Sequence, residues 1–327
     1  MSDQAPNYAS IAAAQKRIEG QAVITPLLSS PRVNAMLGGT LLIKAECLQR
    51  TGSFKFRGAC NAVAMLDDDV KCVVAWSSGN HAQAVSAAAA TRGMRAIIVM
   101  PEDAPTAKIE GTKALGGEVV TYDRYNESRE DIGTSIAAEN NAAIIPPFDY
   151  APVIAGQGTI GAEVGEECKR SGITPHQLVC CTGGGGLLAG VSIGFHHHFP
   201  EADIFAAEPE NFDDFRRSLE RGEICRVAPE ARSICDSILT PQPGEMTFPI
   251  NQQHCSKGLV FSDDDALDAM AFAWTHFKIV VEPGGAAALA AVLNGAVDLK
   301  DKTTVVIVSG GNVDRQMFER ALSRLVA

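Results

Sequence analysis

The sequence predicts an α/β fold in which a mainly parallel sheet is covered by helices on both faces. Short runs rich in β-branched residues alternate along the chain with helix-length, alanine-rich segments. These runs are continuously apolar, as buried parallel strands are, rather than alternating between apolar and polar residues. The length of 327 residues is enough for about two domains with a sizeable core.

The alternation can be followed in chain order. A helix is expected from about residue 54, and helices are also expected at 81–93 and 106–117. Strands are expected at 72–76, 96–100, 118–122, 142–146, 177–182, 203–208 and 303–309. The stretch 222–262 contains several prolines, and we expect it to be an irregular surface excursion.

Composition excludes several classes of protein. The net charge of −11 disfavours a nucleic-acid partner, which normally requires a basic face. The longest apolar runs are too short or too often interrupted to span a membrane, and the first twenty residues lack the order of a secretory signal. Nine cysteines without a CxxC pair indicate buried reduced thiols and a cytoplasmic protein.

Three consecutive histidines, His196 to His198, suggest a metal site at first sight. Neighbouring residues on a helix point about 100° apart, so the three side chains cannot form one facial set of ligands. We expect a polar helix end before Pro200 instead.

A lysine occupies an unfavourable place at the start of the helix that follows residue 52. Ser53 stands where an N-cap belongs, which puts Lys55 and Arg57 in the first turn, beside the positive end of the helix dipole. Each cation there costs about 0.3–1 kcal/mol. A lysine so placed and flanked by phenylalanines has reason to lose its proton, and a neutral amine forms Schiff bases. The alternative is an ordinary surface lysine with a buried stem.

Three strand ends are rich in glycine or serine and each begins a helix: 77–84, 182–190 and 309–314. In α/β folds the carboxyl ends of strands carry the ligands. The loop "TGGGGLLAG" can direct several backbone N–H groups at an anion. It lacks the lysine of a P-loop and matches a dinucleotide fingerprint only from Gly184, with Ala189 in third place and Glu208 ending the next strand. An enzyme that binds a nicotinamide dinucleotide therefore remains an alternative, although a single phosphate group is the simpler ligand for this loop. Together with an activated lysine, that phosphate suggests pyridoxal phosphate, which carries one aldehyde and one phosphate.

Several motifs together resemble the fold-type II pyridoxal-phosphate enzymes, specifically the serine/threonine dehydratase and serine racemase group. The matching segments, in family order, are "LQRTGSFKFRGA", "SSGNHAQA", "IPPFDYAPVIAGQGTIGAEV", "TGGGGLLAG", "AAEPENFDD" and "VSGGNVD". The resemblance implies two open, mainly parallel sheets flanked by helices, with a smaller domain inserted in a larger one. The large pyridoxal-phosphate-binding domain would comprise 1–69 and 149–327, and the small domain 70–148.

The resemblance also implies roles for individual residues. Lys55 would carry the cofactor as a Schiff base and act as the catalytic base, and Ser78 would stand on the opposite face of the ring, where a racemase needs a second acid or base. The phosphate would be bound by backbone N–H groups of the glycine loop: Gly183, Gly184, Gly185, Gly186 and Leu187. Other cofactor contacts would come from Phe54, Asn80, Glu282 and Ser309. The substrate carboxylate would be received by Ser77, Ser78, Asn80 and His81.

Ser309 would face the pyridine nitrogen. A neutral hydroxyl there leaves the ring a weaker electron sink than an aspartate would, which favours elimination over transamination.

The segment "EPENFDD" matches the divalent-cation segment of the family. Glu208, Asp214 and the carbonyl of Phe212 would be the ligands, and such oxygen donors suit Mg²⁺ or Ca²⁺, with Mn²⁺ as another candidate. The alternative is an acidic loop at a helix start, where Asp213 and Asp214 are favourable in any case.

The resemblance thus implies a dehydratase (ammonia-lyase) that converts a β-hydroxy amino acid such as L-threonine or L-serine to a 2-oxo acid and ammonia. The alternatives are a 3-hydroxyaspartate dehydratase, a serine racemase, or a catalytically silent binder of amino acids. The family also implies a homodimer. The chain departs from the family at "SICDSI", at "PGGAAA" after Glu282 and at Trp76, positions near the substrate side chain in relatives, so substrate size and charge stay open.

Overall fold

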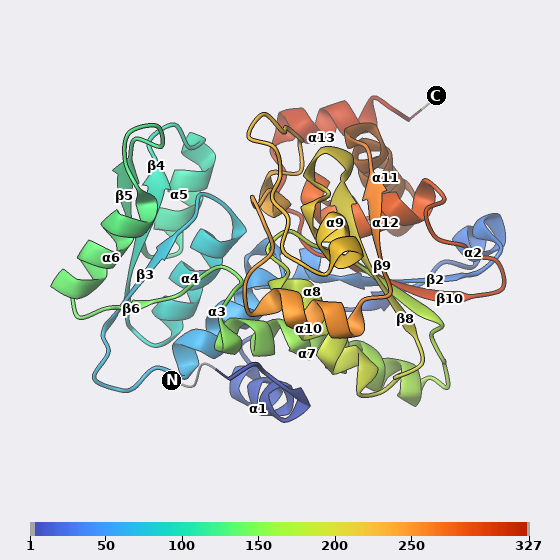
Figure 1. Ribbon diagram of the computed structural model, residues 1–327, viewed down its shortest axis with the longest axis horizontal. Helices are drawn as coiled ribbons and strands as arrows, with labels where there is room; N and C mark the ends of the chain where they lie inside the picture. Colours follow the sequence, from blue (N-terminus) through green and yellow to red (C-terminus); the bar gives the residue numbers. More distant parts are fainter. Residues whose placement is uncertain (1–3, 326–327) are drawn as a thin grey trace.

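The computed structural model describes residues 4–325, and within this range the strands form two separate sheets (Figure 1). The strands are β1 (Leu27–Leu28), β2 (Thr40–Ala45), β3 (Cys72–Trp76), β4 (Arg95–Pro101), β5 (Gly117–Tyr122), β6 (Ala143–Ile144), β7 (Gln177–Cys181), β8 (Asp203–Pro209), β9 (Lys257–Phe261) and β10 (Thr303–Val308). The α-helices are α1 (Tyr8–Ile18), α2 (Pro31–Leu37), α3 (Lys55–Ala64), α4 (Asn80–Thr91), α5 (Thr106–Ala114), α6 (Arg129–Glu139), α7 (Ala151–Arg170), α8 (Gly186–His196), α9 (Asp214–Arg221), α10 (Thr247–His254), α11 (Asp263–Phe277), α12 (Pro283–Leu293) and α13 (Arg315–Leu322).

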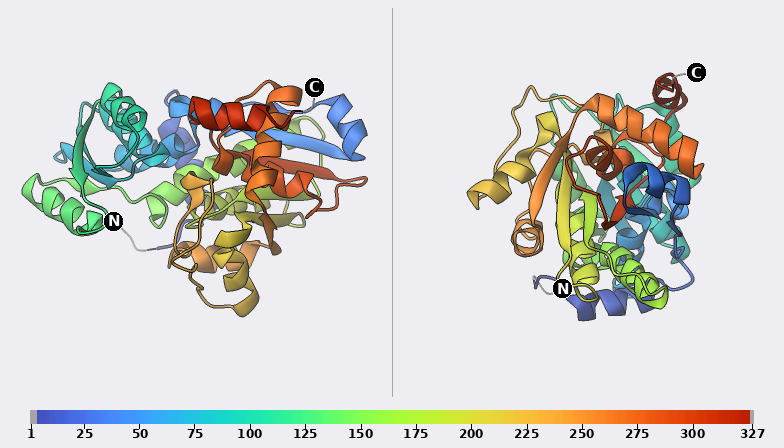
Figure 2. Two further views of the ribbon diagram at one scale, coloured as in Figure 1. Left: turned by 90° about the horizontal axis from the view of Figure 1, so that it is seen from above. Right: turned by 90° about the vertical axis from the view of Figure 1, so that its right-hand side faces the viewer.

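The larger sheet has the order β1-β2-β10-β7-β8-β9. All its pairs are parallel except β1 with β2. Val306 of β10 stands opposite Ile43 of β2 on one side and Val179 of β7 on the other. Helices α11, α12 and α13 lie on one side of this sheet and α7, α8 and α10 on the other (Figures 1 and 2). The predicted sheet with both faces covered is confirmed.

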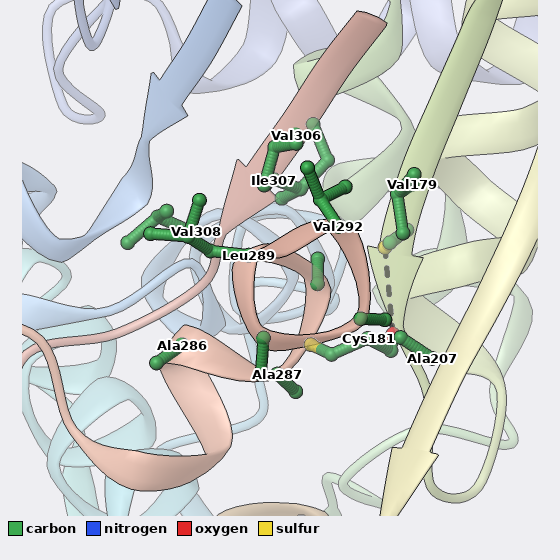
Figure 3. Close-up of a cluster of buried hydrophobic side chains, with 14 of the residues drawn as sticks. Val179, Cys181, Ala207, Ala286, Ala287, Leu289, Val292, Val306, Ile307 and Val308 are labelled. Carbon is green, nitrogen blue, oxygen red and sulfur yellow. Dashed lines mark hydrogen bonds between the residues drawn. The ribbon is translucent and has the colours of Figure 1, made fainter. Parts of the chain in front are cut away.

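Helix α12 lies directly on the centre of the larger sheet. It begins with a proline, which suits a first helical position, and its many alanines let the helix backbone approach β10, β7 and β8 closely. Figure 3 shows Leu289 and Val292 of this helix beside Val306 and Val308 of β10, with Val179 and Cys181 of β7 on the other side. These contacts hold α12 on the sheet, and its first turn is fixed at the end of β10 because the Ser309 N–H donates to the Gly285 carbonyl at 3.2 Å.

The smaller sheet, β5-β4-β3-β6, is parallel throughout. Helices α4 and α5 pack on one face and α6 on the other (Figure 1). The strands of this sheet were predicted at 72–76, 96–100, 118–122 and 142–146, and each is found close to the expected residues. The division of the chain at residues 70 and 148 remains a prediction.

Helices α3, α7 and α8 connect the two parts. Helix α7 packs against both α3 and α8, and its approach to α8 depends on glycine: a Cβ added to Gly161 would lie 2.2 Å from the Val191 carbonyl oxygen. Such contact between two helix backbones leaves no room for a side chain. The position of α3, and therefore of Lys55 at its first residue, is set by its own packing on α7, where a Cβ added to Gly156 would lie 2.6 Å from the Arg57 carbonyl oxygen.

Two local predictions are wrong. Ser53 does not cap α3: the residue before the helix is Phe54, and no side chain caps this end. Ser53 is instead extended and forms an isolated bridge with Gly310.

The stretch 222–262 is only partly irregular, since it contains α10 and the edge strand β9. A proline at the third position of α10 is compatible with a first helical turn, which is why the prolines of this stretch were misleading.

The histidine run does end a helix, as expected, with His196 the last residue of α8. His196 pairs with His254, and His197 stacks on Tyr8. In residues 4–325 none of the helices combines the length and the apolar character that a bilayer crossing requires.

Candidate active site

The carboxyl ends of strands from both sheets meet at one cavity of about 570 Å³. The loop after β3 contributes Ser77, Ser78, Asn80 and His81 to its lining, α3 contributes Lys55 and the residue before α12 contributes Glu282. A narrower hollow of about 50 Å³ shares Lys55, Phe148, Ser237 and Thr240 with this cavity. Its other lining residues are Phe54, Cys181, Thr182, Gly183, Gly184, Gly185, Gly186, Leu187 and Ile238. The structure thus brings together the lysine, the serine loop and the glycine loop that the sequence singled out.

Lys55 is positioned at the first residue of α3 with its amine in the cavity. Its Nζ donates a hydrogen bond to the Pro147 carbonyl at 2.7 Å and lies 5.2 Å from the centre of the Phe54 ring. Burial lowers the pKa of Lys55 to about 8, and the nearby Cys181 opposes this shift. A neutral amine is therefore accessible near neutral pH, as a nucleophile or a base requires.

This pKa predicts how reductive labelling of Lys55 depends on pH. Because the pKa is lowered and the neutral amine is the reactive form, the labelling rate should rise about tenfold between pH 7 and pH 9 and level off at higher pH. Peptide mass spectrometry after treatment with pyridoxal phosphate and cyanoborohydride measures this rate, with Lys71 in the same digest correcting for reagent decay. A rate at Lys55 that keeps rising tenfold per unit up to pH 10 would contradict it.

The glycine loop between β7 and α8 is shaped to leave its N–H groups free. A Cβ on Gly184 would lie 2.4 Å from the Phe148 ring, and Gly185 has a φ of +88° that favours glycine. The loop carbonyls are turned towards α10: Gly184 accepts a hydrogen bond from Thr247 at 2.6 Å, and Gly185 accepts one from Asn251 at 3.0 Å. The N–H groups at the start of α8 have no partner within the helix. The donors and the small hollow beside them fit a phosphate group.

Thr247 and Asn251 were missed by sequence reasoning. The N-terminus of α10, which carries them, is capped by Asp149, whose Oδ1 accepts hydrogen bonds from the N–H groups of Met246 and Thr247 at 3.0 Å each. Because α10 lay in the stretch predicted to be irregular, no local signal pointed to its support of the loop.

Asn80 lies in a chain of hydrogen bonds at the N-terminus of α4. Its Nδ2 donates to Glu282 at 2.6 Å, and its Oδ1 accepts from Asn312 at 2.7 Å. Burial raises the pKa of Glu282 to about 8, so this carboxyl group holds its proton at neutral pH. These hydrogen bonds orient Asn80, which is predicted to contact both the cofactor and the substrate.

His81 is neutral in this environment. Its Nε2 bonds to the Ile145 carbonyl at 2.8 Å, which makes this nitrogen the protonated one. Burial, followed by the charge of Lys55, lowers the pKa of His81 to about 3. The positive end of α4 and the backbone N–H groups after Ser78 can therefore receive a carboxylate without a charged histidine.

The cavity also contains charged side chains that sequence reasoning did not assign. Lys108 of α5 and Asp236 form an ion pair across it at 2.5 Å, and Arg129 lines it from the start of α6. Trp76 and Ser237, two of the positions at which a departure from the family was inferred, line the cavity together with Asp236. A Cβ added to Gly284 would lie 2.2 Å from the Ser237 hydroxyl oxygen. Glycine at 284 therefore leaves room for serine at 237.

Ser309 follows β10 and is buried, with a relative exposure of 3%. It does not line the hollow itself; its hydroxyl accepts a hydrogen bond from the Cys181 thiol at 3.3 Å, and Cys181 does line the hollow.

The predicted metal ligands lie outside the cavity, behind the glycine loop. Glu208 in β8 accepts hydrogen bonds from the N–H groups of Phe215 and Arg216 at 3.0 and 2.8 Å, while Phe212 lies between Glu208 and Asp214 along the chain. Burial raises the pKa of Asp214 to about 7, and Asp214 Oδ2 is buried without a hydrogen-bond partner. Burial and the charge of Asp214 likewise raise the pKa of Glu208. Two buried carboxyl groups, one with an orphaned oxygen, fit a hard cation.

Among residues 4–325, however, no group of three or more His, Cys, Asp or Glu side chains could hold a metal ion. A cation at Glu208 and Asp214 would therefore need carbonyl or water oxygens as its remaining ligands.

Comparison with known proteins is consistent with this geometry. Residues 18–310 match the family model described as pyridoxal-phosphate dependent enzyme. The serine racemase of Schizosaccharomyces pombe is 39% identical over 321 residues, covering 98% of each chain. The L-threo-3-hydroxyaspartate ammonia-lyase of Pseudomonas sp. is also 39% identical over 321 residues, covering 98% of this chain and 99% of its own. The solved structure of maize serine racemase is similar to this chain with a TM-score of 0.91 at 36% identity, over 98% of each chain.

Proposed function

The chain belongs to the family of pyridoxal-phosphate-dependent enzymes, and from this premise we propose that it is a dehydratase (ammonia-lyase) of β-hydroxy amino acids such as L-threonine or L-serine. Its products would be a 2-oxo acid and ammonia. The observation that carries the proposal is that Lys55, with its lowered pKa, lines both the cavity at the N-terminus of α4 and the hollow of the glycine loop.

The residues around the cavity fit pyridoxal phosphate. The N–H groups of Gly183, Gly184, Gly185, Gly186 and Leu187 would hold its phosphate, and Lys55 would hold its aldehyde carbon. Phe54 would pack near its ring, Asn80, oriented by Glu282, would bond its phenolic oxygen, and Ser309 would face its ring nitrogen. When bound, this cofactor supplies a carbonyl group that condenses with amines and a ring that takes up electrons from the substrate α-carbon.

The chain's own residues would bind the substrate and move its proton. Ser77, Ser78, Asn80 and His81 at the N-terminus of α4 would hold the substrate carboxylate, because this end of the helix is positive. The Lys55 amine would then take the proton from the α-carbon as a general base. The β-hydroxyl group would leave as water by taking up a proton, which the Lys55 ammonium group can return, and the released enamine would hydrolyse to the 2-oxo acid and ammonia.

Ser309 supports elimination among the reactions open to this family. Its hydroxyl is neutral, so it does not hold a proton on the ring nitrogen as a carboxylate would. A carbanion with less delocalisation is better suited to expelling a β-leaving group at once.

The proposal is tested by measuring 2-oxo acid release from L-threonine, L-serine and the isomers of 3-hydroxyaspartate, with pyridoxal phosphate and Mg²⁺ present. Release from at least one of them supports the dehydratase. Pyridoxal-phosphate binding at Lys55 without any release would refute the dehydratase while leaving the family assignment intact.

A specific observation favours 3-hydroxyaspartate as a second candidate substrate. Lys108 and Arg129 line the cavity in addition to Lys55, and a second carboxylate needs a cation of this kind. Lys108 is already paired with Asp236 at 2.5 Å, so a dicarboxylate would have to compete with that residue.

The Lys108–Asp236 pair predicts opposite effects of two substitutions on substrate preference. Lys108→Met should lower the ratio of kcat/KM for 3-hydroxyaspartate to that for L-serine by about tenfold, because a charged hydrogen bond is lost. Asp236→Asn should raise the same ratio by freeing Lys108. Because both rates are measured on the same preparation, their ratio does not depend on how much of the enzyme is folded. If the ratio is unchanged in both variants, Lys108 has no role in substrate recognition.

Serine racemase is the other alternative, supported by Ser78, which lines the same cavity as Lys55. A hydroxyl also serves simply to bind a carboxylate, so chiral analysis of the remaining L-serine during turnover decides between the roles.

A divalent cation, Mg²⁺ or else Ca²⁺ or Mn²⁺, is proposed at Glu208, Asp214 and the Phe212 carbonyl. The support is the pair of buried carboxyl groups and the orphaned oxygen of Asp214. At this place, beside β8 and α9, the cation would stabilise the protein rather than touch the substrate.

The metal site predicts that saturating Mg²⁺ raises the melting temperature of the wild-type protein by about 5 °C, since a ligand that binds only the folded state stabilises it. Asp214→Asn should abolish this rise, while Glu220→Gln, at an exposed position of the same helix, should keep it. Differential scanning fluorimetry after chelation measures both, and an equal rise in Asp214→Asn would contradict the site.

We further propose that residues 70–148 form a small domain inserted in the large one, which the separate four-stranded sheet supports.

A cytoplasmic location is supported by the nine cysteines, each a free thiol. A homodimer is supported by the exposed apolar side chains Ile24 and Leu48, which are 80% and 49% exposed. Sedimentation equilibrium tests the dimer.

A further inference from the structure

Trp76 is a large aromatic side chain beside the proposed substrate site that takes no part in the proposed mechanism. It is the last residue of β3 and directly precedes Ser77 and Ser78, which are proposed to hold the substrate carboxylate. All three residues line the same cavity. A substrate whose carboxylate is bound at Ser77 and Ser78 therefore has its side chain in the space that Trp76 borders.

The alternation of β3 decides which way the ring of Trp76 is directed. Residues two apart along a strand share a face of the sheet, so Trp76 is on the same face as Cys72 and Val74. Both of these pack with Ala137 of α6. The ring is thereby directed at α6, which covers this face of the smaller sheet (Figure 1).

A glycine of α6 leaves room for the ring. A Cβ added to Gly133 would lie 2.5 Å from Cε3 and 2.8 Å from Cζ3 of Trp76, which is closer than packed carbon atoms approach. Glycine inside a helix is unfavourable relative to alanine, and here the indole occupies the place of the missing methyl group. An indole is rigid and turns about only two torsions, so this contact holds the ring in one position.

The contact between Trp76 and Gly133 lies at the edge of the cavity. Arg129 stands four residues before Gly133, on the same face of α6, and Arg129 also lines the cavity. The half-buried ring of Trp76 therefore has α6 on one side and the cavity on another.

We propose that Trp76, held in place by Gly133, is a specificity-determining residue that limits the size of the substrate side chain. This inference rests on the proposed function and narrows its substrate class. Amino acids with a short substituent on the β-carbon, such as L-serine, L-threonine and 3-hydroxyaspartate, are accepted. A bulky β-hydroxy amino acid such as L-threo-3-phenylserine is rejected, because its ring would require the indole to leave a packed position.

The first measurement is the ratio of kcat/KM for L-threo-3-phenylserine to kcat/KM for L-serine in the enzyme loaded with pyridoxal phosphate. Trp76→Ala should raise this ratio at least about tenfold, because the side chain that limits the cavity is removed. Trp76→Leu keeps an apolar side chain against α6 and should raise the ratio by a smaller factor. Trp274→Leu replaces the chain's other tryptophan, which is 41% exposed on α11, and should leave the ratio unchanged.

Gly133→Ala tests the contact itself. The added methyl group displaces the ring, which borders the cavity, so the ratio of kcat/KM for L-threonine to that for L-serine should fall about fivefold. In the Trp76→Ala background the same substitution should leave this ratio unchanged, because no ring remains to be displaced. Gly111→Ala in α5 is the matched control, since the atom nearest to an added Cβ there is 3.9 Å away.

A binding measurement reports the same selectivity without turnover. L-Alanine and L-phenylalanine have no β-leaving group, and their dissociation constants can be measured from the absorption of the bound cofactor. The ratio of the constant for L-phenylalanine to that for L-alanine should fall about tenfold in Trp76→Ala and rise in Gly133→Ala.

The outcomes separate this inference from the proposed function. Selectivity unchanged in both Trp76→Ala and Trp76→Leu, or an effect of Gly133→Ala that persists without the ring, overturns the role of Trp76 while the dehydratase stands. If the wild type binds L-alanine but releases no 2-oxo acid from any β-hydroxy amino acid, the dehydratase fails, and the binding ratio decides on Trp76. If the wild type binds neither L-alanine nor L-phenylalanine, both fail.

Discussion

Replacing Lys55 by alanine should lower 2-oxo acid release by at least about 10³-fold, because the same amine is both the attachment point for the cofactor and the general base. The fold should survive. The Lys55 side chain makes one hydrogen bond, to Pro147, and alanine favours the first turn of a helix at least as well as lysine does.

The measurement is a 2-oxo acid assay with the best substrate, alongside circular dichroism of the variant. Lys71→Ala, at an exposed lysine outside the cavity, is the matched control and should retain wild-type turnover. Added ethylamine should restore part of the lost rate by supplying a free amine in the space that Lys55 leaves. Wild-type turnover in Lys55→Ala would refute the assignment of the catalytic lysine.

Replacing Arg57 by methionine should lower the free energy of unfolding by about 3–5 kcal/mol, because it leaves buried carboxylates without their main partner. Arg57 is fully buried and donates to both oxygens of Glu46 at 2.8 Å and to both oxygens of Glu163 at 2.5 and 2.9 Å. Although burial alone would raise the pKa of Glu46, the charge and hydrogen bonds of Arg57 hold it below its usual range. Lys44 completes the cluster through a bond to Glu163 at 2.6 Å.

Chemical denaturation measures this loss. Arg315→Met removes an arginine from an exposed ion pair and should change stability by less than about 0.5 kcal/mol. The double variant Arg57→Met/Glu46→Leu should regain part of the loss, since replacing both members of a buried pair by apolar residues removes the unpaired charge. A loss of similar size for Arg57→Met and Arg315→Met would contradict the role given to the buried cluster.

The two cations in the first turn of α3 have different roles. From the sequence both are expected to destabilise the helix start, and only Lys55 is assigned a function. The structure separates them: Lys55 points its amine into the cavity, and Arg57 turns into a neutral cluster of two acids and two bases. Such a cluster is invisible in sequence because Lys44 and Glu46, at the end of β2, meet Arg57 of α3 and Glu163 of α7 only through tertiary packing.

The sequence by itself determined the fold class, most strands and the three strand-end loops of the site. These features depend on local signals: apolar runs, glycine where a Cβ does not fit, and helix starts that attract anions. It also singled out Lys55, the serine loop and the glycine loop, since their chemistry is carried by short contiguous motifs.

Only the tertiary structure decided how those loops are held and what else faces the cavity. Thr247 and Asn251 turn the glycine-loop carbonyls outward from more than 60 residues away. Lys108 and Asp236 meet across the cavity over 128 residues, and so do Cys181 and Ser309 beneath it. No local pattern encodes such pairs, because nothing in the sequence around one partner points to the other until helix and strand packing brings the two within hydrogen-bond distance.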